Sequence, residues 1–141
     1  MKRSSLLFPP ILLMLGCSGA SPSISEQITK QFKASQTEPI DLSAVGPASW
    51  ERVCILSPYS TNQSAEKVLG FKWDVESKTP IAGSDGINVL VFVQEQRVVA
   101  YTEHPRNLGD FSKLQPRCLV RSQATVDRES DGSGWVFFVA R

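Results

Sequence analysis

The sequence predicts an α+β fold, with one or two helices packed on an antiparallel sheet of about four or five strands. Three observations lead to this prediction. Apolar residues recur at four-residue intervals near the start of the predicted domain, which is helical spacing. Several later segments are rich in β-branched and aromatic residues, as strands are. Short polar segments separate some of these strands, and short connections favour antiparallel pairing.

Two segments have the pattern of helices. Residues 23–35 carry one apolar stripe, and Ser23 with Glu26 fits a capping box, in which each side chain binds the other residue's backbone amide. Residues 60–70 carry a shorter apolar stripe that ends at Gly70, a residue that favours helix termination. These two segments account for the one or two helices of the predicted fold.

Strands are expected at residues 50–59, 87–93, 97–102, 117–128 and 134–140, with a further short strand as an option at 71–75. The segment 50–59 is apolar on both faces, which is typical of an interior strand. Residues 87–93 and 97–102 flank a short polar corner, so they are expected to form a hairpin. A glycine-containing turn joins 117–128 to 134–140, which predicts a second hairpin.

The first residues of the chain have the features of an export signal. Lys2 and Arg3 form a basic start, and the uncharged segment 6–16 follows. This segment is shorter than the roughly 20 residues that a membrane-spanning helix needs, and Pro9 and Pro10 interrupt it. A basic start and a short apolar run that ends in small residues are typical of a secretory signal peptide.

The motif Met14-Leu15-Gly16-Cys17 resembles the lipobox of bacterial lipoproteins, in which a cysteine follows an aliphatic and small-residue triplet. The resemblance implies that Cys17 carries acyl chains such as palmitate and becomes the N-terminus of the mature protein. Two or more acyl chains hold a protein stably in a membrane. Ser18 stands where an aspartate would imply retention in the inner membrane. The resemblance therefore implies an outer-membrane lipoprotein that faces the periplasm.

This interpretation divides the chain into a signal peptide at 1–16, a flexible tether at 17–23 and a single α+β domain at 24–141. Cleavage would remove Lys2 and Arg3, so the 15 basic residues of the chain become 13 against 14 acidic ones. The mature net charge is therefore about −1. A protein without a basic surplus is not expected to bind nucleic acid.

Cys54 and Cys118 remain once Cys17 is assigned to the lipid. In an oxidising compartment, two remaining cysteines are expected to form a disulfide. The alternative is two free thiols buried in the core. Neither cysteine lies in a Cys-x-x-Cys motif, and the chain contains one histidine, so a zinc site would lack ligands.

One acidic segment has part of a calcium-loop pattern. Asp127, Glu129 and Asp131 alternate before Gly132, as oxygen ligands do at the start of such a loop. The twelfth position is Phe138, where a calcium loop needs a bidentate glutamate. The alternation fits the solvated face of a hairpin better, so no metal and no cofactor is expected.

Two loops carry the candidate contacts with a partner. Tyr59 follows a buried strand, and one polar connection brings His104, Arg106 and Asp110 together in the sequence. Loops on a rigid scaffold often carry function, and the planar fork of Arg106 suits a carboxylate or a phosphate. The competing interpretation is structural: Arg106 pairs with Asp110 at i,i+4, and Phe111 fills the core.

The functional hypothesis is a non-enzymatic binding or interaction module, with a protein partner in the envelope and a role in envelope maintenance, immunity or inhibition. It rests on the predicted anchor, the single small domain and the lack of a catalytic motif. The alternative is a small periplasmic hydrolase that uses His104 with Asp110 or Asp85. The segments WERVCILSPYS, LGFKW and EHPRNLGDF are similar to small uncharacterised lipoproteins of Gram-negative bacteria. That resemblance implies no particular activity.

Overall fold

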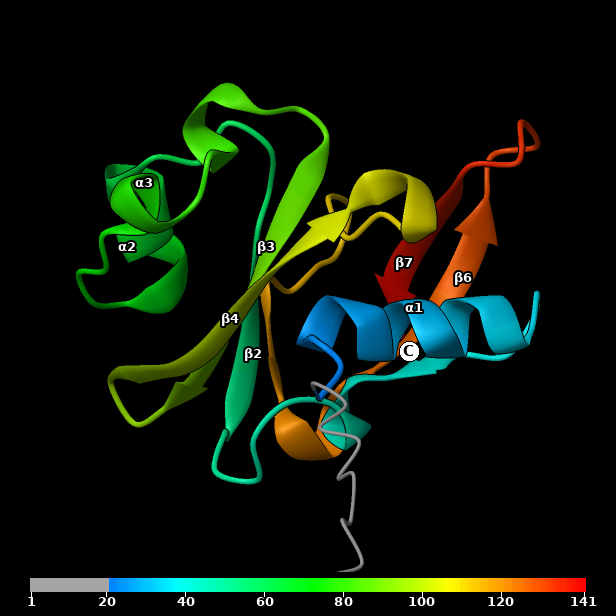
Figure 1. Cartoon of the computed structure of the whole chain (residues 1–141), viewed down its shortest axis with the longest axis horizontal. Helices are drawn as coiled ribbons and strands as arrows, with labels where there is room; N and C mark the ends of the chain where they lie inside the picture. Colours follow the sequence, from blue (N-terminus) through cyan, green and yellow to red (C-terminus); the bar gives the residue numbers. More distant parts are fainter. Residues whose placement is uncertain (1–20) are drawn as a thin grey trace, which may run out of the picture.

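A computed structural model describes residues 21–141 and confirms the α+β class. The predicted signal peptide, Cys17 and most of the predicted tether lie outside the described residues. The strands form two antiparallel sheets, one of four strands and one of three, where a single sheet was expected. Figure 1 shows the layers: α2 and α3 lie on one side of the four-stranded sheet, and α1 and the three-stranded sheet lie on the other.

The four-stranded sheet has the order β4-β3-β2-β5. Its strands are β2 (Arg52–Leu56), β3 (Ile87–Gln94), β4 (Arg97–Pro105) and β5 (Cys118–Val120). The interior position of β2 confirms the prediction from its two apolar faces, and β3 with β4 forms the predicted hairpin. The three-stranded sheet has the order β1-β6-β7, with β1 (Ile40–Asp41), β6 (Thr125–Ser130) and β7 (Val136–Ala140).

Helix α1 (Ile24–Ala34) begins with the predicted capping box. The hydroxyl of Ser23 accepts the amide of Glu26 at 3.1 Å, and the Glu26 carboxylate accepts the amide of Ser23 at 2.7 Å. The apolar stripe of α1 faces the core, where Ile28 is fully buried and Phe32 packs edge-on against Phe138. Capping and burial thus act together on the same helix.

Residues 71–78 differ from the prediction. Helix α2 (Asn62–Leu69) ends at Gly70 in the left-handed conformation, as expected. No strand forms at residues 71–75, because the carboxylate of Asp74 accepts the amide of Ser77 at 3.2 Å and begins helix α3 (Val75–Lys78). The N-cap bond gives a partner to one of the amides that the first turn of α3 leaves free.

The predicted strand 117–128 is split by a 3₁₀ turn at Arg121–Gln123, so β5 and β6 belong to different sheets. The side chain of Arg121 holds the chain at this turn. Its guanidinium donates to the carbonyls of Ser43, Pro47, Ala48 and Trp50 at 2.9–3.3 Å, and it lies 4.6 Å from the centre of the Trp50 ring. These bonds tie the chain to a distant loop at the point where it leaves one sheet for the other.

The core has two parts, one on each face of the four-stranded sheet. Trp50, Phe92 and Phe111 are fully buried on the face covered by α1 and the three-stranded sheet. Cys54 and Val91 lie on the face covered by α2 and α3. Each large apolar side chain buried in this way contributes about 1.5–3 kcal/mol. Shorter 3₁₀ turns complete the fold at Leu42–Ala44, Ile81–Gly83 and Arg106–Leu108.

Among residues 21–141, no helix has the length and apolar character that crossing a membrane requires.

Candidate functional site

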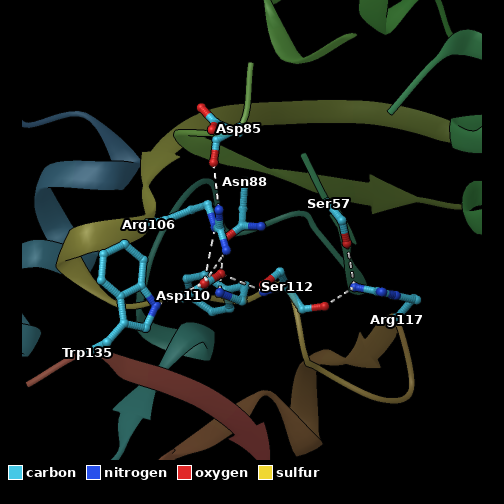
Figure 2. Close-up of polar contacts among 9 residues, drawn as sticks. Ser57, Asp85, Asn88, Arg106, Asp110, Ser112, Arg117 and Trp135 are labelled. Carbon is cyan, nitrogen blue, oxygen red and sulfur yellow. Dashed lines mark hydrogen bonds and ion pairs between the residues drawn. The ribbon is translucent and has the colours of Figure 1, made fainter. Parts of the chain in front are cut away.

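The ends of β2 and β4 and the loops before β3 and β5 meet at one end of the four-stranded sheet. Antiparallel pairing brings these segments together, although they are far apart in the sequence. We call a set of residues from these segments the loop rim; hydrogen bonds join all of them except Tyr59, and Figure 2 shows the joined residues. The loop rim consists of Ser57, Tyr59, Asp85, Arg106, Asp110, Ser112 and Arg117.

Arg106 and Asp110 form the centre of the loop rim. The Nε and Nη2 atoms of Arg106 donate to Asp110 Oδ2 at 3.1 and 2.8 Å, and Nη1 donates to the Asp85 carbonyl at 2.7 Å. The indole of Trp135 also donates to Asp110 Oδ2, and the amide of Ser112 donates to Asp110 Oδ1. The ion pair that the i,i+4 spacing predicted is therefore present.

Asp110 is fully buried, yet it stays ionised at neutral pH. Burial raises the pKa of its carboxyl, but hydrogen bonds from Arg106, Ser112 and Trp135 outweigh burial and hold the pKa below its ordinary value. Both carboxylate oxygens accept hydrogen bonds from donors of this chain, so the carboxylate has a structural role. It joins the end of β4 to the loop before β5 and to β7.

His104 lies beneath the loop rim and is also fully buried. Its Nε2 is 3.1 Å from the Leu108 carbonyl, and its Nδ1 is 2.9 Å from the Ser25 hydroxyl. Because a carbonyl only accepts, this network assigns the ring proton to Nε2 and makes Nδ1 the acceptor. Burial lowers the pKa of His104 despite the bond to Leu108, so the ring is neutral at pH 7.

A serine hydroxyl beside a histidine nitrogen resembles a nucleophile and its base. In this protein the pair lies between helix α1 and β4, where the Ser25 amide also donates to the Thr102 hydroxyl at 3.2 Å. The two bonds hold the first turn of α1 on the sheet. The hydrogen bonds of His104 do not include Asp110, which binds Arg106. They do not include Asp85 either, whose carbonyl accepts from Arg106.

Asn88 and Phe111 form the floor of the loop rim. The Asn88 carboxamide oxygen accepts the Phe111 amide at 2.9 Å. The Phe111 ring is fully buried and packs against His104 and Phe138. Asn88 Nδ2 is buried without a hydrogen-bond partner among the described residues. Phe111 thus fills the core, as the structural interpretation of this loop predicted.

Tyr59 and Asp85 are the exposed members of the loop rim, and Arg117 is half-buried. Tyr59 is 59% exposed and has a φ of 65°, a left-handed conformation that is rare for an aromatic residue. Its amide donates to the Ile81 carbonyl at 2.9 Å and lies 3.3 Å from that of Ser84, which fixes the backbone. Such outliers persist where the surroundings hold them, and they are frequent at functional sites.

Arg117 was not predicted as a site residue. Its Nη1 donates to the Ser57 hydroxyl at 2.6 Å and to the Ser112 carbonyl at 2.9 Å (Figure 2). The ion pairs that form within residues 21–141 involve Arg106 and Arg141, so Arg117 has no carboxylate partner in that part of the chain. Nothing in the local sequence distinguishes Arg117, because its neighbours on the loop rim come from distant segments.

Cys54 and Cys118 form the predicted disulfide. They are directly opposite each other on β2 and β5, with Cα atoms 4.0 Å apart. The bond therefore links an interior strand to an edge strand. This pairing excludes the alternative of two free buried thiols.

The acidic segment near the C-terminus forms a hairpin between β6 and β7. Asp127 pairs with Arg141 at 3.3 Å, and the Asp131 carboxylate accepts the Ser133 amide at 2.9 Å. Over the range that the structure describes, no three His, Cys, Asp or Glu side chains gather in a way that could hold a metal ion.

Comparisons of the chain with protein-family models, with curated proteins and with solved structures gave no match.

Proposed function

We propose that this protein is a lipid-anchored binding module of the bacterial envelope, held at the outer membrane through Cys17 and facing the periplasm, and that it captures a protein partner with the loop rim. The proposal rests on the exposure and the backbone conformation of Tyr59. A large aromatic side chain is exposed in a constrained backbone conformation, at the edge of loops that are bonded to one another. Rigid exposed aromatic residues are frequent anchors of protein interfaces.

The polar network supports a rigid binding surface. Arg106 joins the loop before β3 to Asp110, and Arg117 joins the end of β2 to Ser112. Three segments are therefore held in fixed positions before any partner binds. Pre-organisation of this kind lowers the entropy that association would otherwise cost.

The predicted anchor would keep this surface near the membrane. Ser23, which caps α1, is six residues after Cys17. A fully extended chain spans at most about 3.5 Å per residue, so the tether would reach about 20 Å. The described domain would remain within that distance of the lipid, which suits capture of partners close to the membrane.

The burial of His104 and Asp110 favours the binding module over the hydrolase alternative. A general base needs to reach the proton that it removes from the substrate or the nucleophile. Each ring nitrogen of His104 already has a partner within this chain, and the Asp110 carboxylate is bonded to Arg106. These contacts support a structural role for both residues.

Site-specific photo-cross-linking in cells tests the proposal. A photoreactive phenylalanine analogue replaces Tyr59 in one variant and Val120 in a matched control. Both positions are exposed, at 59% and 51%, but Val120 is the partner of Arg52 at the opposite end of β2. We expect a discrete cross-linked protein from position 59 and none from position 120. Equal products from both positions, or no product from position 59, would overturn the proposal.

A further inference from the structure

The guanidinium of Arg52 lies beside both sulfur atoms of the disulfide. Its Nη1 is 3.1 Å from Cys54 Sγ and 3.6 Å from Cys118 Sγ. Its Nη2 donates to the Leu69 carbonyl at 2.8 Å, at the C-terminal end of α2. The second bond fixes the direction of the guanidinium, so the cation is held next to the sulfur atoms.

We infer that the Cys54–Cys118 disulfide is a thiol-exchange site, at which a dithiol reductant attacks Cys118 and Cys54 leaves as a thiolate that Arg52 stabilises. This inference goes beyond the proposed binding function and does not depend on it. The chemical class of the co-reactant is a dithiol, either a small molecule or the paired cysteines of an oxidoreductase. The inference rests on the unequal surroundings of the two sulfur atoms.

Cys54 is suited to be the leaving group. It lies on the interior strand β2 and is fully buried. A thiolate without a partner in such a place is costly, because burial disfavours charge. Arg52 supplies the opposite charge at hydrogen-bond distance from this sulfur. Stabilisation of the leaving thiolate makes the exchange faster and shifts the redox equilibrium toward the reduced protein.

Cys118 is suited to be the sulfur that is attacked. It lies on β5, an edge strand of the four-stranded sheet, and the residue is half-buried. An attacking thiolate approaches from the side remote from the leaving sulfur, and the edge strand has no neighbouring strand on that side. Cys118 Sγ is also 3.4 Å from the Val68 carbonyl. After reduction, the neutral Cys118 thiol would donate a hydrogen bond to that carbonyl.

The exchange balances without any further reagent. The first thiolate of the dithiol forms a bond to Cys118 Sγ, the Cys54–Cys118 bond breaks, and its electron pair leaves with Cys54. The second thiolate of the reductant then attacks the mixed disulfide and releases Cys118 as a thiolate, which takes up one proton. The dithiol is oxidised to a disulfide and loses two protons, of which one goes to Cys118 and the other to solvent; the disulfide of the protein is reduced to one thiolate and one thiol.

The test measures the rate at which dithiothreitol reduces the disulfide at pH 7, followed by alkylation and mass spectrometry. Full-length protein with Cys17→Ser is used, so that two cysteines remain. Arg52→Met removes the charge, and Arg52→Lys keeps it. We expect reduction to be about tenfold slower in Arg52→Met, because the leaving thiolate loses the cation beside it; this fold-change corresponds to about 1.4 kcal/mol of activation free energy. Arg52→Lys is expected to stay within about threefold of the Cys17→Ser parent.

Arg52→Lys also separates the charge from the packing role of Arg52. A lysine cannot bind the sulfur atoms and the Leu69 carbonyl in the same geometry, so loosening of α2 would affect both variants. Slow reduction of Arg52→Met together with near-normal reduction of Arg52→Lys supports the inference. Reduction of Arg52→Met at the parental rate or faster overturns it, as does an equal slowing of both variants.

Discussion

The guanidinium of Arg106 binds the buried carboxylate of Asp110 through two nitrogen atoms, at 2.8 and 3.1 Å. The Arg106 side chain is 26% exposed, and the Asp110 side chain is not exposed at all. The pair therefore connects the surface of the loop rim with its interior. Arg106 also binds the Asp85 carbonyl, and Asp110 also binds the Trp135 indole. Asp85 precedes the pair in the sequence and Trp135 follows it, so the pair connects three parts of the chain.

Replacing Asp110 with Asn is expected to lower the free energy of unfolding by about 2–4 kcal/mol, because Arg106 and the Trp135 indole lose their ionised acceptor. Urea unfolding followed by tryptophan fluorescence measures this change. The matched control is Asp127→Asn, which removes the exposed pair with Arg141. An exposed pair contributes below about 1 kcal/mol, so the control should change little. Equal effects of both substitutions would contradict a structural role for Asp110.

Arg106→Ala distinguishes the two interpretations of this loop. If Arg106 acted only as a contact residue, its loss would leave stability nearly unchanged and abolish partner capture. Because the Asp110 carboxylate would be left buried without its cation, we expect the melting temperature to fall clearly. Thermal unfolding monitored by circular dichroism checks this. An unchanged melting temperature would show that the carboxylate does not need this partner.

The free energy of unfolding should depend on pH through the titration of His104. It is the one histidine of the chain, and burial lowers its pKa below the ordinary value of 6.5. The unfolded chain therefore binds a proton at a higher pH than the folded chain does, so stability rises with pH in this range. We expect full stability above about pH 7 and a decline as the pH falls below about 6.5. Urea midpoints between pH 5.5 and 7.5 measure the slope, and His104→Gln should flatten it. A flat profile in the unmodified protein would rule out a buried neutral histidine.

Removing the disulfide is expected to destabilise the fold. The bond closes a loop with a sequence separation of 64 residues. The chain-entropy model gives about 4 kcal/mol for a loop of this length. The double substitution Cys54→Ala and Cys118→Ala should therefore shift the urea midpoint strongly downward. Non-reducing mass spectrometry of the exported protein should find its mass two hydrogens lower than after reduction, and two free thiols would contradict the bond.

Cys17→Ser tests the predicted anchor. The sulfur is the expected acceptor of the first acyl chains, so the variant should lose labelled palmitate and move from the membrane to the soluble periplasmic fraction. Cell fractionation and labelling measure both effects. Retention of the variant in membranes with undiminished label would refute the lipoprotein assignment.

Several features could be predicted from the sequence because they depend on neighbours along the chain. The capping box of Ser23 and Glu26 involves residues three positions apart. Burial of β2 on both faces follows from its continuous apolar side chains, and the β3–β4 hairpin follows from two strand patterns around a short polar corner. The ion pair of Arg106 with Asp110 follows from their i,i+4 spacing. The disulfide partners could be predicted because only two cysteines remained to pair.

Other features were decided by contacts between distant segments. Residues 117–128 look like one strand, but Arg121 binds carbonyls 71–78 positions earlier in the chain, and the strand divides between two sheets there. Arg117 enters the loop rim through Ser57, which is 60 positions away. Hydrophobic periodicity and capping describe interactions within one element. The division into two sheets and the assembly of the loop rim depend on which buried polar groups find partners across the fold, and that is settled only when the elements pack.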